Sequence, residues 1–285
     1  MNDFFQRKCE GDNQAVRQSL YEGTVYLLPA TEASTQFVID VWSELRAAFG
    51  ELDPREAQFS LSSDEFFARA GQLRKLFYTT GLFHRHVCAV TQSVGFPPDE
   101  HAFDPVRLRT VTHDGHLNPS AQAVYHGHRD TWYSNPQSMI TWWIPLHDVQ
   151  PEETFEFFPD DFARSVANDS EGFDFDTWVA DGQEKRIGWQ NRLTGTTAQY
   201  PQLREAPQGR RIPVTCRAGD ILLFSGQHLH QTRKNVTGLT RFSMDFRTVH
   251  LGDHNRGLEA LNVDDRSTGS SLKQFISGVD HCEGV

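Results

Sequence analysis

Two short histidine-containing stretches, about a hundred residues apart, place the strongest constraint on how this chain folds. The first has His128 and Asp130 in the order His-x-Asp, and the second has His228 and His230. Side chains two residues apart on a β-strand point the same way, so His128 and Asp130 would project together and Arg129 would point away. A fold that uses both stretches must therefore bring two distant strands together.

Two histidines and one carboxylate can cap one face of a metal ion and leave the opposite face open, as in non-haem Fe(II) oxygenases. We predict that His128, Asp130 and His230 hold Fe(II). The three remaining positions on an octahedral ion would accept a 2-oxo acid, through its keto oxygen and carboxylate, and O2 or water. The arrangement predicts an oxygenase rather than a general binding domain.

Two alternatives to these histidines are open at this point. His126 could replace His128, but no carboxylate follows it two residues later. His228 and His230 share a strand face, so spacing alone does not separate them. The position of His230, eleven residues before Arg241, favours it. Tyr125 flanks the first stretch, as does Trp132, and either could wall a pocket.

Arg241 and Ser243 predict a clamp for the cosubstrate. Both would point to one face of a strand over 239–249, and a guanidinium binds a carboxylate through two parallel hydrogen bonds. The serine hydroxyl can donate a third. The spacing from His230 fits a hairpin that returns one strand beside the other. Arg247 is the alternative clamp, but no serine follows it two residues later.

The first hundred residues are mostly helical in pattern. Apolar residues recur at helical spacing from Phe37 to Phe49, and Gly50 is expected to end that helix. Ser62 and Glu65 form a possible capping box for a second helix. These helices are expected to cover one sheet of a barrel.

From Val106 onward the apolar pattern changes to alternation, which predicts short strands. Many short strands separated by turn residues favour a mainly β fold with helical additions, a double-stranded β-helix of the jelly-roll or cupin type. Such a barrel is wide enough at its mouth for a metal and a small ligand. The expected strands cover 106–111, 123–126, 139–146, 154–158, 211–217, 221–224 and 239–249.

With these motifs in order, the chain resembles the phytanoyl-CoA dioxygenase-like branch of the Fe(II)/2-oxoglutarate oxygenases. The resemblance covers roughly residues 104–250. Beyond the metal and clamp residues, it rests on Trp143-Ile144-Pro145-Leu146 and on Gly219-Asp220 before an apolar strand. It departs from the family at 157–162, where relatives commonly carry a Pro-Gly-Ser-His turn.

The resemblance implies roles for individual residues. His128, Asp130 and His230 match the iron ligands, and Arg241 with Ser243 matches the site for the distal carboxylate of 2-oxoglutarate. Thr141 falls where relatives often place a hydroxyl for the cosubstrate. The implied reaction uses O2 and releases succinate and CO2 while a C–H bond of a small organic substrate is oxidised, most simply by hydroxylation, in secondary metabolism or a similar pathway.

Length and composition favour one catalytic domain over 1–285. Its parts would be a helical support (1–103), the barrel (104–250) with an insertion or lid (160–209), and a C-terminal extension (251–285). The net charge of −11, with no basic run, argues against nucleic acid as a partner. No run approaches a membrane span, and isolated cysteines fit a reducing cytoplasm. The oligomeric state is left open.

Two other functions compete with the oxygenase. A cupin-like metalloenzyme that does not use 2-oxoglutarate would not need Arg241 with Ser243. A non-catalytic ligand-binding barrel would not need three open metal positions.

Overall fold

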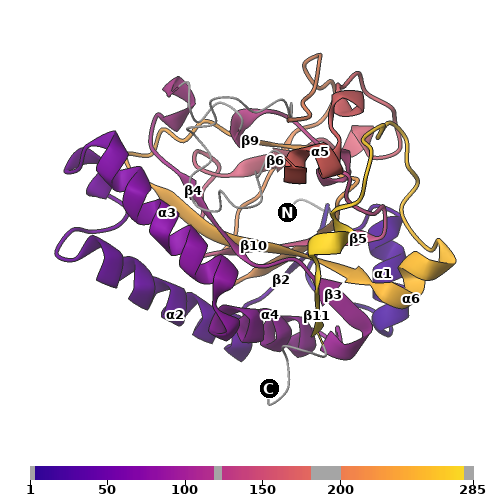
Figure 1. The fold of residues 1–285 in the computed structure, drawn as a ribbon, viewed down its shortest axis with the longest axis horizontal. Helices are drawn as coiled ribbons and strands as arrows, with labels where there is room; N and C mark the ends of the chain where they lie inside the picture. Colours follow the sequence, from indigo (N-terminus) through magenta and orange to yellow (C-terminus); the bar gives the residue numbers. More distant parts are fainter. Residues whose placement is uncertain (1–3, 119–123, 181–199, 279–285) are drawn as a thin grey trace.

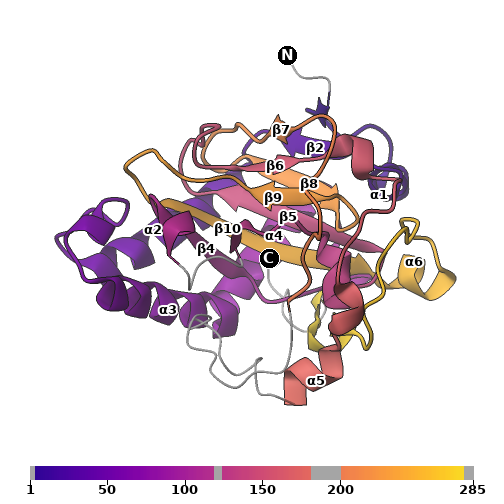
Figure 2. The same ribbon diagram turned by 90° about the horizontal axis from the view of Figure 1, so that it is seen from above.

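A computed structural model describes residues 4–118, 124–180 and 200–278, and shows two β-sheets with the long N-terminal helices on one side (Figures 1 and 2). The larger sheet has eight strands and the smaller has three. Neighbouring strands run antiparallel except for the first pair. In order, the larger sheet contains β1 (Phe5–Gln6), β2 (Val25–Leu28), β8 (Ile221–Ser225), β5 (Met139–Pro145), β10 (Arg241–His250), β3 (His101–Phe103) and β11 (Ile276–Ser277), with β4 (Arg107–Val111) also pairing with β10. The smaller sheet contains β7 (Ile212–Pro213), β6 (Phe155–Phe157) and β9 (His230–Thr232).

The N-terminal helices cover the outer face of the larger sheet (Figure 1). The long helix α2 starts at a capping box on Thr31 and ends at Gly50, whose φ of 65° suits glycine. The capping box of Ser62 and Glu65 opens α3, as predicted. The helices are α1 (Asn13–Tyr21), α2 (Glu32–Phe49), α3 (Ser63–Thr79), α4 (Gly81–Ser93), α5 (Phe175–Ala180) and α6 (Leu251–Arg256).

Strand β10 divides the molecule into an apolar side and a polar side. Phe242, Met244 and Phe246 point into the core beneath the helices. The alternate positions, from Arg241 to Arg247, point to the opposite face, as strand geometry requires. That face looks toward the smaller sheet, and its apolar wall consists of Val25, Leu27, Trp143, Val149, Phe155, Phe157, Val214, Leu222 and Phe224. The larger sheet thus places buried polar groups between two apolar layers.

The fold is the expected mainly β type, a double-stranded β-helix with helical additions. Strands appear at five of the predicted places as β4, β5, β6, β8 and β10. Within 211–217, Ile212–Pro213 forms β7, and Cys216 makes an isolated bridge with Val149. The first hundred residues also contribute β2, which sits inside the larger sheet. A short, fully buried apolar strand has no alternation that distinguishes it from a helix.

Two predictions about the strands near the histidines were wrong. Within 123–126, residues 124 and 125 form a helical turn, and Ala123 lies outside the described residues. The stretch from His230 to Arg241 is not a hairpin, because β9 pairs with β6 whereas β10 pairs with β5 and β4. The chain between them crosses from one sheet to the other. Buried Asn235 holds the crossing by donating to the carbonyl oxygens of Val111 and Leu239.

The predicted 160–209 segment contains α5 and short helical turns, and residues 181–199 lie outside the described parts, Trp189 among them. In the extension after 250, α6 is followed by β11, which pairs with β3. None of the helices described is long and apolar enough to cross a bilayer. Cys88 is disulfide-bonded, so the cysteines do not by themselves indicate a reducing compartment.

Candidate metal centre

His128, Asp130 and His230 meet at the edge of the space between the two sheets. One ligand atom from each side chain lies within 4.8 Å of the others. Reciprocal backbone hydrogen bonds of 3.0 Å join His128 to His230 in an isolated bridge. Asp130 is not on a strand, because it opens the 3-10 helix Asp130–Tyr133. The three side chains form the one cluster with metal-ligand spacing among the described residues.

His128 and His230 are each oriented by a hydrogen bond to the backbone carbonyl two residues earlier. Nδ1 of His128 lies 2.9 Å from the carbonyl oxygen of His126, and Nδ1 of His230 lies 3.0 Å from that of His228. A carbonyl only accepts, so each Nδ1 carries the proton and each Nε2 keeps its lone pair. This leaves Nε2 free to bind a metal, and a second hydrogen bond of this kind is usual for metal-bound histidine.

The charge states also suit a metal site. Although burial acts to raise it, the pKa of Asp130 lies well below its usual value, mainly because of the charge of Arg247. Burial lowers the pKa of His230 to about 4. Asp130 is therefore an anion and His230 a neutral imidazole at neutral pH, which are the forms that bind Fe(II).

His228 and His113 lie outside this cluster. Nε2 of His228 donates to the carbonyl oxygen of Gly23 over 3.1 Å, and the ring packs against Phe162 and Phe157. Its neighbour two residues on, His230, faces the other histidine instead. Nδ1 of His113 accepts from the backbone of Gly238.

Arg241 is a buried guanidinium that forms no ion pair with the described residues. The residue is 3% exposed, and its Nε and Nη1 have no hydrogen-bond partner among the described residues. Its guanidinium carbon lies 5.7 Å from the centre of the Trp143 ring. Burial lowers its pKa to about 10, so it stays charged at neutral pH. An unpaired buried cation is costly, and a bound carboxylate would supply the missing hydrogen bonds.

Aromatic rings lie between Arg241 and both Ser243 and the metal cluster. The indole nitrogen of Trp143 donates to Oγ of Ser243 over 2.9 Å, which leaves the serine hydroxyl hydrogen free to donate. The ring of Phe155 lies 5.2 Å from that of Trp143 and 5.8 Å from that of His230. The arginine and the metal cluster therefore share one wall of the same space.

Arg247, the alternative clamp, is already paired. It donates to Asp104 at 3.2 Å and to Asp130 at 3.5 Å, and lies 3.6 Å from Asp245. Against the effect of burial, the charges of Asp130, Asp104 and Asp245 raise its pKa. Arg247 therefore pairs with the carboxylate of Asp130 and is not available to bind the carboxylate of a cosubstrate.

Several residues at the site were not singled out from the sequence. Arg109 on β4 forms two hydrogen bonds of 2.7 Å with Asp245, which strand alternation on β10 could have indicated. The ring of Tyr133 lies 5.5 Å from that of His128. Trp132 and Tyr125 flank the first histidine stretch. Trp132 is fully buried, whereas Tyr125 is only partly buried. Burial raises the pKa of Tyr125, and the nearby charge of Arg241 acts to lower it.

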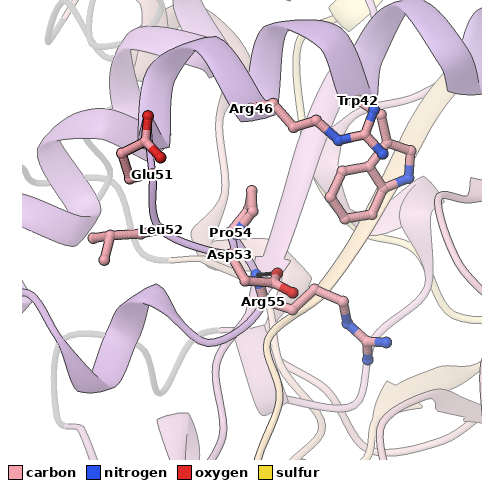
Figure 3. A pocket seen from close by; sticks show the side chains of 7 residues that line it. All are labelled: Trp42, Arg46, Glu51, Leu52, Asp53, Pro54 and Arg55. Carbon is pink, nitrogen blue, oxygen red and sulfur yellow. Dashed lines mark hydrogen bonds between the residues drawn. The ribbon is translucent and has the colours of Figure 1, made fainter.

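A surface hollow lies elsewhere, at the end of α2 (Figure 3). Trp42 and Arg46 line it together with the loop 51–55. Arg55 connects it to the interior by donating to the carbonyl oxygen of Thr240 and to Glu153. None of the metal-cluster residues lines this hollow.

The comparisons with known proteins point to one family. The family model described as phytanoyl-CoA dioxygenase (PhyH) matches residues 40–243. No curated protein matches the chain.

Solved structures with a similar chain course include a non-haem monooxygenase, an epimerase and a protein complexed with 2-oxoglutarate. The apo form of the non-haem monooxygenase ThoJ is 12% identical, with a TM-score of 0.43, covering 88% of this chain and 86% of its own. The epimerase SnoN, in complex with Fe3+, alpha-ketoglutarate and nogalamycin RO, is 15% identical, with a TM-score of 0.45 and coverage of 92% and 98%. EvdO2 from Micromonospora carbonacea var. aurantiaca, complexed with 2-oxoglutarate, is 10% identical, with a TM-score of 0.43 and coverage of 85% and 92%. At these scores the similarities support neither a shared substrate nor a shared reaction.

Proposed function

The chain belongs to the phytanoyl-CoA dioxygenase family of iron- and 2-oxoglutarate-dependent oxygenases, and from that premise we propose that it hydroxylates a C–H bond of a small organic molecule. Succinate and CO2 would be the products formed from 2-oxoglutarate. The observation that carries the proposal is the pairing of a metal-type cluster with the unpaired, buried Arg241 across one shared wall.

In this proposal the three cluster residues bind Fe(II) from one side. His128 and His230 supply neutral Nε2 atoms, and Asp130 supplies the anion. Bound iron supplies the activation of O2 in this chemistry. Three protein ligands leave the remaining positions on the ion open to the cosubstrate and O2.

The remaining named residues orient the cosubstrate. Arg241 binds the distal carboxylate of 2-oxoglutarate, which satisfies the guanidinium nitrogens that have no other partner. Ser243 donates its free hydroxyl hydrogen to the same carboxylate. The hydroxyl of Thr141 contacts Asp130, so we propose that it influences cosubstrate binding through the metal ligand. The aromatic rings of Trp143 and Phe155 form a wall between Arg241 and the metal cluster, and this wall keeps water away from the space beside it.

The test is an anaerobic titration of the apoprotein with Fe(II) and then 2-oxoglutarate, followed by the weak visible absorption band of the chelate. We expect a band in the wild-type protein and a weaker band in Arg241→Ala. Arg210→Ala serves as the matched control, because Arg210 pairs with Asp160 on the surface. Iron binding without a band would favour a metalloenzyme that does not use 2-oxoglutarate, and no iron binding would favour a non-catalytic barrel.

We also propose that the chain is a single catalytic domain. The largest hydrophobic core contains Phe37 and Phe77 from the helical support together with Trp142 and Phe242 from the barrel, so the two parts share one core. A cytoplasmic location, a substrate from secondary metabolism and the absence of a nucleic-acid partner remain predictions from the sequence.

A further inference from the structure

Arg129, between the first two metal-cluster residues, connects four separate segments of the chain. The residue is fully buried. Its guanidinium donates to the carbonyl oxygens of Asp161 and Arg164, each at 2.8 Å, and to that of Gln227. Gln227 lies three residues before His230, so Arg129 ties the stretch that carries His128 and Asp130 to the turn that leads to His230.

The counterion of Arg129 comes from the C-terminal extension. Nε of Arg129 lies 3.0 Å from Oδ1 of Asp264, and neither side chain is exposed. Asp264 also accepts from the indole nitrogen of Trp132 at 2.8 Å and from the backbone of Val166 at 3.0 Å. A buried cation needs such a fully bonded partner, because leaving it alone carries a large desolvation penalty.

The same extension holds a strained turn at Ser134, just after the metal-binding stretch. The φ of Ser134 is 58°, a left-handed conformation that residues other than glycine rarely adopt. Its N–H donates to Oγ of Ser267 at 3.0 Å, and its hydroxyl donates to the carbonyl oxygen of Thr268 at 2.6 Å. Its own carbonyl accepts from the N–H of Ser271 at 3.0 Å. Such a conformation persists where the surroundings fix it.

Backbone pairing with the strands provides little of this support. His128 makes a single isolated bridge, and Asp130 lies in a one-turn 3-10 helix that ends at Ser134. In Figure 1 the yellow chain of the extension runs beside α5, where Thr268 pairs with Asp174. The metal-binding stretch is therefore packed between the barrel and the extension.

We propose that residues 264–271 of the C-terminal extension position the metal ligands, with Asp264 and Ser267 as positioning residues that act through Arg129 and Ser134. The inference rests on the proposed metal site. It predicts that metal affinity depends on contacts made about 130 residues after the first ligand. Removing such indirect support of a ligand typically costs about 10–100-fold in metal affinity.

The test uses Co(II), whose visible spectrum reports ligand geometry, titrated into the full-length apoprotein. Asp264→Asn is the principal variant and keeps the shape of the side chain. Ser267→Ala is the milder second variant, because it removes one acceptor for the N–H of Ser134. We expect the Co(II) Kd to rise about tenfold or more in the first and severalfold in the second, with an altered visible spectrum in both.

The matched control is Glu171→Gln, which breaks an exposed ion pair between Arg266 of the same extension and Glu171. Its Kd and spectrum should equal those of the wild-type protein. Each titration is carried out well below the Tm of that apoprotein. A weaker Co(II) affinity then reflects altered ligand positions and not unfolding of the protein. Unchanged Kd and spectrum in folded Asp264→Asn and Ser267→Ala would overturn the inference while leaving the metal site intact. A wild-type protein that binds no Co(II) would remove both the inference and the proposed function.

Discussion

The hydroxyl of Thr141 donates a 2.7 Å hydrogen bond to Oδ2 of Asp130. Register explains the contact, since Thr141 on β5 lies opposite Arg247 on β10, and Arg247 also reaches Asp130. The carboxylate is thus held from two strands of the larger sheet, although Asp130 itself lies in a 3-10 helix outside that sheet. The family resemblance implies that Thr141 lies near the cosubstrate, and its hydroxyl contacts a proposed metal ligand.

Thr141→Val should weaken metal binding while the fold is kept. The substitution preserves the shape of the side chain and removes the hydroxyl, so Asp130 loses one of its orienting hydrogen bonds. We expect the Co(II) Kd to rise about tenfold. Thr141→Ser keeps the hydroxyl and should stay near the wild-type value. Equal affinity in the valine and serine variants would show that the hydrogen bond has no role in metal binding.

Asp130→Ala should remove most of the iron affinity. The change deletes the one anionic ligand and also leaves Arg247 without one of its partners. We expect a loss of at least about 100-fold in Fe(II) affinity, measured anaerobically by calorimetry. Asp245→Asn on β10 serves as the comparison, because Asp245 also lies beside Arg247 but does not belong to the cluster. Iron affinity and turnover at the wild-type level in Asp130→Ala would refute the assignment of the ligands.

Arg241→Ala should raise the concentration of 2-oxoglutarate needed for turnover. A charge-assisted hydrogen bond contributes about 1.5–3 kcal/mol, so we expect KM for 2-oxoglutarate to rise by roughly 10–100-fold. Arg241→Lys should recover only part of this loss, because an ammonium cannot form two parallel hydrogen bonds. Iron affinity should not change. If Arg247→Ala raised this KM and Arg241→Ala did not, the clamp would be Arg247.

The two neighbouring histidines should give opposite phenotypes. His230→Ala should abolish metal binding with a modest effect on stability. His228→Ala should retain metal binding but lower the Tm, because it empties a buried position among Phe4, Phe157 and Phe162. Metal titrations and thermal melts of both variants decide the matter. Loss of metal in His228→Ala alone would exchange the two roles.

A buried ion pair far from the metal cluster should contribute stability that depends on pH. Arg17 and Asp253 are 4% and 2% exposed, and Arg17→Met should cost about 3 kcal/mol in the free energy of unfolding at pH 7. Burial acts to raise the pKa of Asp253, but the hydrogen bond and charge of Arg17 lower it overall. The pair therefore stabilises the fold above the carboxyl's unfolded pKa of about 4 and loses this effect as the pH falls further.

Urea unfolding of the wild-type protein and Arg17→Met between pH 7 and pH 3 measures this difference. It should shrink below about pH 4. Arg256→Met is the control, because Arg256 contacts the same carboxylate from an exposed position and should contribute about 1 kcal/mol or less. A difference that is independent of pH would show that Arg17 acts by packing rather than by charge.

Much of this site follows from local patterns. Alternation on β10 correctly places Phe242 and Met244 in the core and Arg241 on the opposite face. The capping box of Ser62 and Glu65 marks the start of α3 and Gly50 marks the end of α2, as predicted, because these signals depend on neighbouring residues alone. The strand predicted at 123–126 does not form in its described residues, where Val124 and Tyr125 make a helical turn and the carbonyl oxygen of Tyr125 accepts from the side chain of Gln231.

By itself, the sequence determined which residue types are available for the site, their order along the chain and the strand faces on which many of them lie. Only the tertiary structure decided which of two equivalent residues faces the cluster: His230 rather than His228, with Arg241 unpaired and Arg247 neutralised by aspartates. It also revealed that Asp264 neutralises Arg129. The physical reason is that a side chain's direction follows from its own backbone, whereas its partner depends on strand register and on segments far away in the chain.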